Sequence, residues 1–121
     1  MSDDPFTVNL LEETKEAIKN FGQDISNIIF IGSQESGHEC SWELFEVLAN
    51  REYDSGYGGQ EVAEDLIIVF KDGTRMLRGE YDGSEWWECL KPFSRPKEFH
   101  QIRSLFPKTC WRTLSETNNE K

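Results

Sequence analysis

The chain has 121 residues and a mass of 14.1 kDa, a length that predicts one domain. Its formal net charge is −10, but eight Phe, four Trp and three Tyr supply large side chains that a disordered acidic chain would lack. No apolar run approaches the roughly 20 residues that span a bilayer, the N-terminal residues show no secretory signal, and the acidic charge disfavours direct nucleic-acid binding. We therefore expect a folded cytoplasmic protein without a membrane partner.

The first half of the chain predicts a helix, a strand and a second helix. Residues 7–21 have apolar side chains near helical spacing, with Thr7 or Asn9 as the cap and Gly22 as the stop. Residues 27–31 are apolar and mostly β-branched, which predicts a buried strand. A second helix is expected to follow the cap residue Ser41 and to end at Asn50. One acidic stripe is expected on this helix, formed by Glu39, Glu43 and Glu46.

The middle of the chain gives the clearest structural signal. Residues 66–70, 75–81 and 84–90 are apolar or alternating runs, separated by two Asp-Gly dipeptides. This pattern predicts an antiparallel meander of three strands. On the last strand Trp86 and Trp87 must point to opposite faces. One of them is expected in the core and the other as an exposed anchor, and the pattern does not decide which.

The C-terminal part predicts a third helix and a last strand. Pro96 stands where a first helical turn accepts proline, so a helix is expected from about Arg95 to Phe106. Residues 109–114 are expected to form a short strand. The predicted fold is an α+β domain of residues 1–114, in which an antiparallel sheet with a central meander packs against two or three helices. Residues 115–121 are expected to form a loose polar tail.

Charge is distributed unevenly along the chain. Residues 1–88 contain 20 acidic and six basic residues, a net charge of −14, whereas residues 89–114 have a net charge of +5. Nine acidic residues against one arginine fall within residues 33–66. The distribution predicts an acidic face and a smaller basic face. The plain alternative is a solvated surface that keeps a small protein in solution.

Motifs for catalysis or cofactor binding are not found. The three cysteines, Cys40, Cys89 and Cys110, cannot all pair and predict free thiols in a reducing compartment. His38 and Cys40 lack the spacing of a zinc knuckle, so no metal site is expected. The glycine-rich residues 53–59 lack the lysine of a phosphate-binding loop. We therefore predict no catalytic residue and no cofactor.

Two segments resemble known sequences. Residues 53–58, YDSGYG, and residues 80–88, EYDGSEWWE, are similar to small uncharacterised proteins of bacteriophages and prophages, and the resemblance covers about the middle half of the chain. It implies an anti-defence role of the anti-CRISPR kind, exerted in the cytoplasm of an infected bacterial host. It transfers no functional residue, because these proteins have no known catalytic motif.

The leading functional hypothesis is a non-enzymatic inhibitor that binds a basic, nucleic-acid-binding surface of a host defence protein such as a CRISPR effector. The residues expected to bind this partner are Glu39, Glu43, Glu46, Tyr53, Asp54, Tyr57, Glu85, Trp86 and Trp87. The alternative is a protein that sequesters a nucleotide signal of host immunity through Arg95, Lys97, Trp111 and Arg112. A toxin-immunity protein fits the same pattern. A homodimer is compatible with the sequence, which does not determine the oligomeric state.

Overall fold

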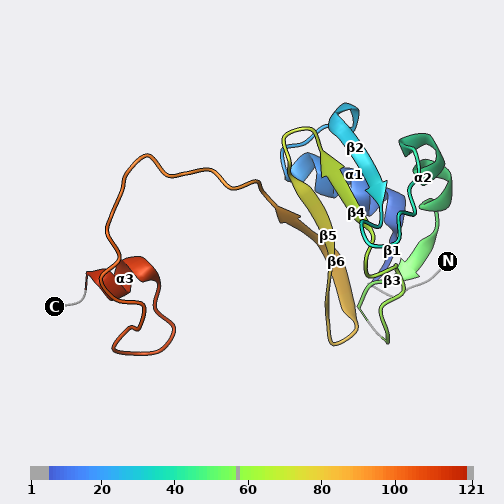
Figure 1. The fold of residues 1–121 in the computed structure, drawn as a ribbon. Coiled ribbons are helices and arrows are strands. Elements are labelled where there is room, and N and C mark those ends of the chain that lie inside the picture. The colour runs from blue at the N-terminus through green and yellow to red at the C-terminus, as the bar shows by residue number, and fades with distance from the viewer. Residues whose placement is uncertain (1–5, 57, 120–121) are drawn as a thin grey trace.

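The computed structural model describes residues 6–56 and 58–119. It has two antiparallel sheets and three α-helices, so the predicted α+β fold class is confirmed. The elements in chain order are β1 Thr7–Asn9, α1 Leu10–Asn20, the 3-10 turn η1 Ile25–Asn27, β2 Ile28–Gly32, α2 Trp42–Leu48, β3 Glu52–Asp54, β4 Ile67–Phe70, β5 Arg75–Tyr81, β6 Ser84–Leu90 and α3 Leu114–Asn118 (Figure 1).

The main sheet has the strand order β2-β4-β5-β6, and every neighbouring pair is antiparallel. The last three strands form the predicted meander. At its second turn Asp82 and Gly83 have φ angles of 51° and 88°. Two central residues with positive φ define the hairpin turn that Asp-Gly favours, because its twist matches that of the flanking strands.

Helix α1 begins later than the sequence pattern predicts. Residues 7–9 form β1, which pairs with β3 in a second, two-stranded sheet. The side chain of Asn9 accepts the amide of Glu12 at 3.1 Å and caps the helix. Helical periodicity cannot reveal this strand, because its partner lies more than 40 residues away. The predicted stop is confirmed, since the Gly22 amide donates to Lys19 and closes the last turn.

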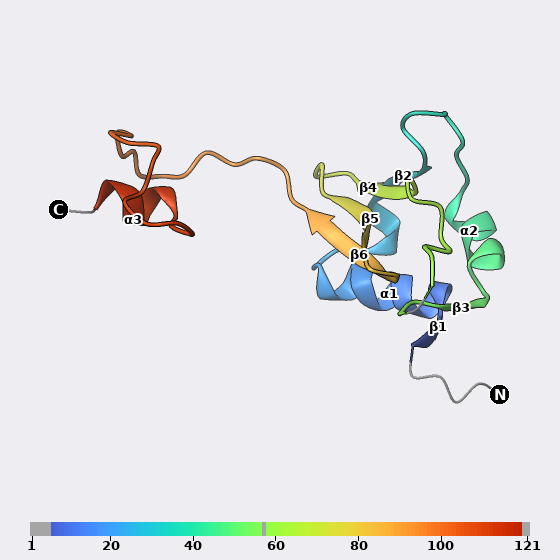
Figure 2. The same cartoon turned by 90° about the horizontal axis from the view of Figure 1, so that it is seen from below.

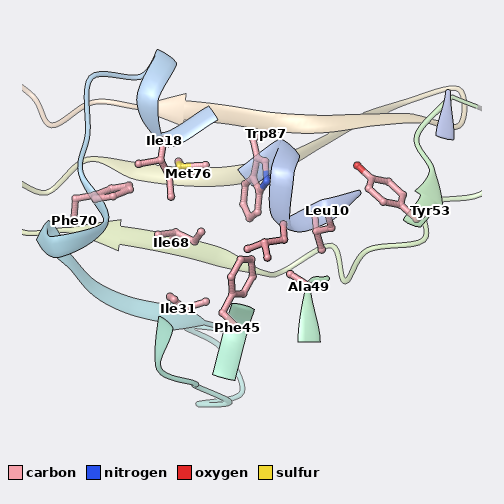
Figure 3. Packing of buried hydrophobic residues seen from close by; sticks show 11 residues of the cluster. Leu10, Ile18, Ile31, Phe45, Ala49, Tyr53, Ile68, Phe70, Met76 and Trp87 are labelled. Atoms are coloured by element: carbon pink, nitrogen blue, oxygen red, sulfur yellow. The ribbon is translucent and has the colours of Figure 1, made fainter. Parts of the chain in front are cut away.

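The core lies between α1 and one face of the main sheet (Figure 3). Ile18 of α1 belongs to one buried cluster with Ile68, Met76 and Trp87 of the sheet, all of them at most 6% exposed. Phe45 and Ala49, from the α2 region, extend the same cluster, and the expected cap Ser41 accepts the amide of Leu44. The buried members are Leu10, Leu11, Ile18, Ile31, Phe45, Ala49, Tyr53, Ile68, Phe70, Met76 and Trp87.

The C-terminal part differs from the prediction. Residues 91–113 contain neither the helix expected from Arg95 to Phe106 nor the strand expected over 109–114, and both predictions are wrong. The apolar side chains that were to hold that helix against the sheet are exposed, Phe99 at 82% and Phe106 at 84%. A short amphipathic helix needs such burial to be stable. The helix that forms instead, α3, covers residues 114–118, most of the stretch expected to be a loose tail. The domain boundary at residue 114 stays a prediction.

Candidate functional site

The predicted acidic stripe is not carried by one helix. Helix α2 begins at Trp42 after the cap Ser41, so Glu39 precedes it and forms a β-bridge with Gly32 instead. Glu43 and Glu46, three residues apart on α2, share a face, with Glu43 exposed and Glu46 half-buried. The prediction of a three-residue helical stripe is therefore wrong, although all three carboxylates lie within one continuous stretch.

These carboxylates are not neutralised by neighbouring bases. Among the described residues the ion pairs link Arg78 with Glu13 and Glu85, and Arg112 with Glu116, and the imidazole of His100 lies 3.3 Å from Glu98. None of them includes a carboxylate of residues 33–66. We name the acidic surface after four residues of this stretch, Glu39, Glu43, Glu46 and Glu52. Its uncompensated charge attracts cations and basic surfaces over about a Debye length, roughly 8–10 Å.

Three residues expected at the partner contact are buried. Tyr53 is 6% exposed, Glu85 3% and Trp87 6%, so their assignment to a contact surface is wrong. Glu85 and Trp87 lie on the inner face of β6, toward α1, and Tyr53 is buried where β3 pairs with β1. The strand alternation of the two tryptophans is confirmed, with Trp87 in the core and Trp86 37% exposed.

Arg78 is the centre of a buried polar network. Its Nη2 atom donates to Glu85 Oε1 and to the Tyr53 hydroxyl, both at 3.0 Å, and its guanidinium carbon lies 4.8 Å from the Trp87 ring centroid. The Tyr53 hydroxyl in turn donates to Glu13 at 2.5 Å. A buried arginine held by a carboxylate and an aromatic face is costly to disrupt, because removal of one partner leaves the other charge uncompensated.

Two members of this network, Glu13 and Tyr53, have raised pKa values. Burial raises the pKa of the Glu13 carboxyl, against the hydrogen bond from Tyr53 and the charge of Arg78, which lower it. Burial also raises the pKa of the Tyr53 hydroxyl, and the hydrogen bond to Glu13 adds to the effect. Tyr53 therefore stays protonated and acts as a hydrogen-bond donor at neutral pH.

Glu85 also fixes the loop between β3 and β4. Its two carboxylate oxygens accept the backbone amides of Glu61 and Val62 at 2.7 and 3.2 Å, and its own amide donates to Ser55 at 2.7 Å. Asp54, expected at the partner contact, serves the same loop, because its side chain accepts the amide of Gly56. Its amide donates to Glu61. These contacts tie residues 55, 61 and 62 to the ends of β3 and β6.

A groove of about 500 Å³ lies between α1 and β6. Three carboxylates of α1, Glu12, Glu13 and Glu16, face an apolar wall that includes Phe21 and Trp87. We name it the acidic groove. These glutamates are not among the residues predicted for a site, because acids on the polar side of an amphipathic helix are ordinarily solvated. The i, i+4 spacing of Glu12 and Glu16 beside the apolar face was the available signal.

The remaining predicted residues are scattered. The indole of Trp86 donates to Glu88 on the outer face of β6, at 3.2 Å. Tyr57 lies outside the described residues. Arg95 and Lys97 are exposed in the segment after β6, and Trp111 is 99% exposed. Arg112 pairs with Glu116 at 3.0 Å on the neighbouring turn of α3.

The residues of the nucleotide-binding alternative do not line the hollow of the C-terminal segment. The C-terminal hollow of about 890 Å³ is lined by Phe99, Arg103 and Leu114 among others, and by none of Arg95, Lys97, Trp111 and Arg112. The alternative stays a prediction.

Groups that would support metal or thiol chemistry are dispersed in the described ranges. No three His, Cys, Asp or Glu side chains there come together as metal ligands. Burial and the neighbouring Glu39 raise the pKa of the Cys40 thiol, which disfavours the nucleophilic thiolate at neutral pH. The helices of the same ranges are all too short or too polar to cross a membrane.

Comparisons were made with protein families, with curated proteins and with solved structures. None of the three finds a match to this chain. The fold and the distribution of charge are therefore the observations on which a function is proposed.

Proposed function

We propose that this protein is a non-enzymatic inhibitor that acts in the cytoplasm of a phage-infected bacterium and binds a basic, nucleic-acid-binding surface of a host defence protein such as a CRISPR effector. The observation that supports this proposal is the set of exposed carboxylates between residues 33 and 66, which no lysine or arginine of the described chain neutralises. Carboxylates held on a folded surface replace phosphates in a channel lined by lysine and arginine.

The acidic surface and the acidic groove have different parts in this proposal. The acidic surface supplies charge that accelerates encounter with a basic partner. The groove supplies what charge alone lacks, an apolar wall beside carboxylates, where the aliphatic stem and the charged head of one arginine or lysine are accommodated together. Glu12 and Glu16 would face the head group of that side chain.

The test uses a purified CRISPR effector loaded with its guide RNA as the probe. Binding is measured across about 50–500 mM salt, where screening shortens the reach of surface charges. We expect affinity to fall steeply with salt and binding to compete with the target DNA. Expression of the chain in cells that carry the effector and a matching guide should restore plaque formation by the targeted phage.

Substitutions distinguish a contribution of the acidic surface to binding from a contribution of the net charge of the protein. The variant E39Q/E43Q removes two exposed carboxylates and is expected to weaken binding at least about tenfold. The matched control E80Q/E98Q removes the same net charge elsewhere and should bind like the unmodified chain. Equal effects of the two pairs, or affinity that does not change with salt, would contradict the proposal.

A further inference from the structure

One face of the main sheet is not covered by any helix of the described chain. Figure 2 shows α1 on one side of the four strands, while the opposite side lies open. Strand register places Phe30, Val69, Arg75 and Leu90 side by side on this opposite side. We name the open face after its apolar residues, which are Phe30, Ile67, Val69, Leu77, Trp86 and Leu90.

The open face is hollowed and has an acidic edge. Two hollows of about 390 and 380 Å³ share Ile67 and Arg75 in their lining, so they are adjacent. The second is also lined by four carboxylates, which we name the acidic rim: Glu35, Glu64, Asp65 and Glu88. An apolar surface with a negative edge fits a segment that combines aromatic side chains with positive charge.

The C-terminal segment, residues 91–119, has this composition. It contains six basic and two acidic residues. Both acids have local partners, because Glu98 lies 3.3 Å from His100 and Glu116 pairs with Arg112. Its aromatic side chains are almost fully exposed: Phe93 at 84%, Phe99 at 82%, Phe106 at 84% and Trp111 at 99%.

This segment is also internally ordered by polar contacts. The Asn118 side chain accepts the amides of Arg103 and Ser104 at 2.8 and 2.9 Å and so ties α3 to the chain before it. Thr113 and Glu116 form a capping box at the start of α3. These contacts hold residues 103–118 together, so this part of the segment loses little further freedom on docking.

We propose that the C-terminal segment of one copy docks on the open face of a second copy, in a twofold exchange dimer. Figures 1 and 2 both show the segment leaving the end of β6 and running away from its own sheet. Each copy presents one open face and one segment, so two reciprocal contacts close the assembly without a free end.

The available area is sufficient for such a dimer. Four aromatic side chains bury roughly 150–250 Å² each, which amounts to about 600–1,000 Å² from one segment alone. Two segments contribute in the closed dimer, and stable interfaces bury about 1,200–2,000 Å² in total. The exposed aromatic residues can therefore supply most of a standard interface.

The test measures the mass of the full chain in solution by light scattering and sedimentation, over about 1–100 µM. We expect a species of twice the chain mass of 14.1 kDa at the upper concentrations. The variant F99S/W111S should raise the dimer dissociation constant at least about tenfold, because exposed aromatic residues dominate such contacts. Leu90→Lys should do the same from the other side, since it replaces an apolar side chain of the open face by a second positive charge, opposite Arg75.

Control variants and cysteine labelling distinguish docking of a second copy from docking of the same copy's C-terminal segment on the open face. Val47→Ser removes a 72% exposed apolar side chain from α2 and should leave the dimer unchanged. A monomer at every concentration in which Cys110 reacts slowly with maleimide would show that the segment folds back on its own sheet, and would overturn the proposal. A monomer with rapidly labelled Cys110, or a dimer insensitive to F99S/W111S, would also overturn it.

Discussion

The indole nitrogen of Trp87 donates a hydrogen bond of 2.9 Å to the hydroxyl oxygen of Thr14, across 73 residues of sequence. The Thr14 hydroxyl donates its own proton to the Leu10 carbonyl one turn earlier in α1, at 2.7 Å. Thr14 is completely buried and Trp87 nearly so. The two bonds satisfy both polar groups in the core and fix the position of α1 on β6.

Replacement of Thr14 by valine should lower the free energy of unfolding by about 1–3 kcal/mol, because the buried indole N–H then lacks an acceptor. Trp87→Phe removes the donor together with part of the ring volume. In the double variant the lost acceptor no longer matters, so we expect a coupling energy of about 0.5–3 kcal/mol in a double-mutant cycle by urea denaturation. Strictly additive losses would show that the hydrogen bond contributes nothing.

The buried pair of Arg78 and Glu85 yields a larger effect. Glu85→Leu leaves the guanidinium with the neutral Tyr53 hydroxyl and with one carboxylate, Glu13, at 3.8 Å, and should cost about 3–5 kcal/mol of stability. Because Glu85 also accepts the amides of Glu61 and Val62, hydrogen exchange at these two amides should accelerate beyond the global change. Glu52→Leu, at an exposed position of β3, is the matched control and should show neither effect.

Local signals in the sequence were sufficient for the meander. The Asp-Gly turns and the alternation of β5 and β6 depend on residues that are close in sequence, and the structure confirms both turns and strand limits to within one residue. The alternation of β6 could not decide which face is buried, because Trp86 and Leu90 compete with Trp87. That choice depends on α1 and on Arg78, and it brings Glu85 inward with Trp87.

The failed predictions have a common physical cause. Residues 95–106 have helical periodicity, but without a surface to pack against, a short amphipathic helix is not stable. The groove beside Glu12, Glu13 and Glu16 could not be predicted, because the sequence does not show that β6 lies next to α1. Burial of Tyr53 depends on the pairing of β1 with β3, a contact between distant segments.

Glu13 gives the protein a component of stability that increases on acidification. Its raised pKa means that the folded state holds this proton more firmly than the unfolded state, so this group favours folding as the pH falls from 7 through that pKa. Glu13→Gln imitates the protonated form and should be more stable than the unmodified protein at pH 7, with a difference that shrinks toward pH 5 in urea titrations.

Other carboxyl groups lower the stability on acidification, both in the unmodified protein and in the Glu13→Gln variant. The Thr74 amide holds the pKa of Asp72 below its usual range, so that contribution is present at neutral pH and is lost in acid. The difference between variant and unmodified protein is therefore the quantity to follow. Glu16→Gln, which removes one charge from the same helix, controls for net charge. A Glu13→Gln difference independent of pH would contradict the assignment.

Gly32 ends β2 at the point where the chain returns as Glu39, and the position has no space for a side chain. A Cβ atom there would lie 1.9 Å from the His38 carbonyl oxygen, and the φ angle of 156° adds strain for any other residue. Gly32→Ala should therefore move residues 33–39, which include Glu35 and Glu39, and should lower stability by about 1–3 kcal/mol. Gly37→Ala is the control, since its Cβ would meet open space. Because the φ angle of Gly37 is 79°, Gly37→Ala should cost only the smaller backbone strain of about 1–2 kcal/mol.

The stability of the two variants is compared by urea denaturation, and the position of residues 33–39 by their amide chemical shifts. Equal shifts of these amides in both variants would show that the close contact at Gly32 does not position residues 33–39.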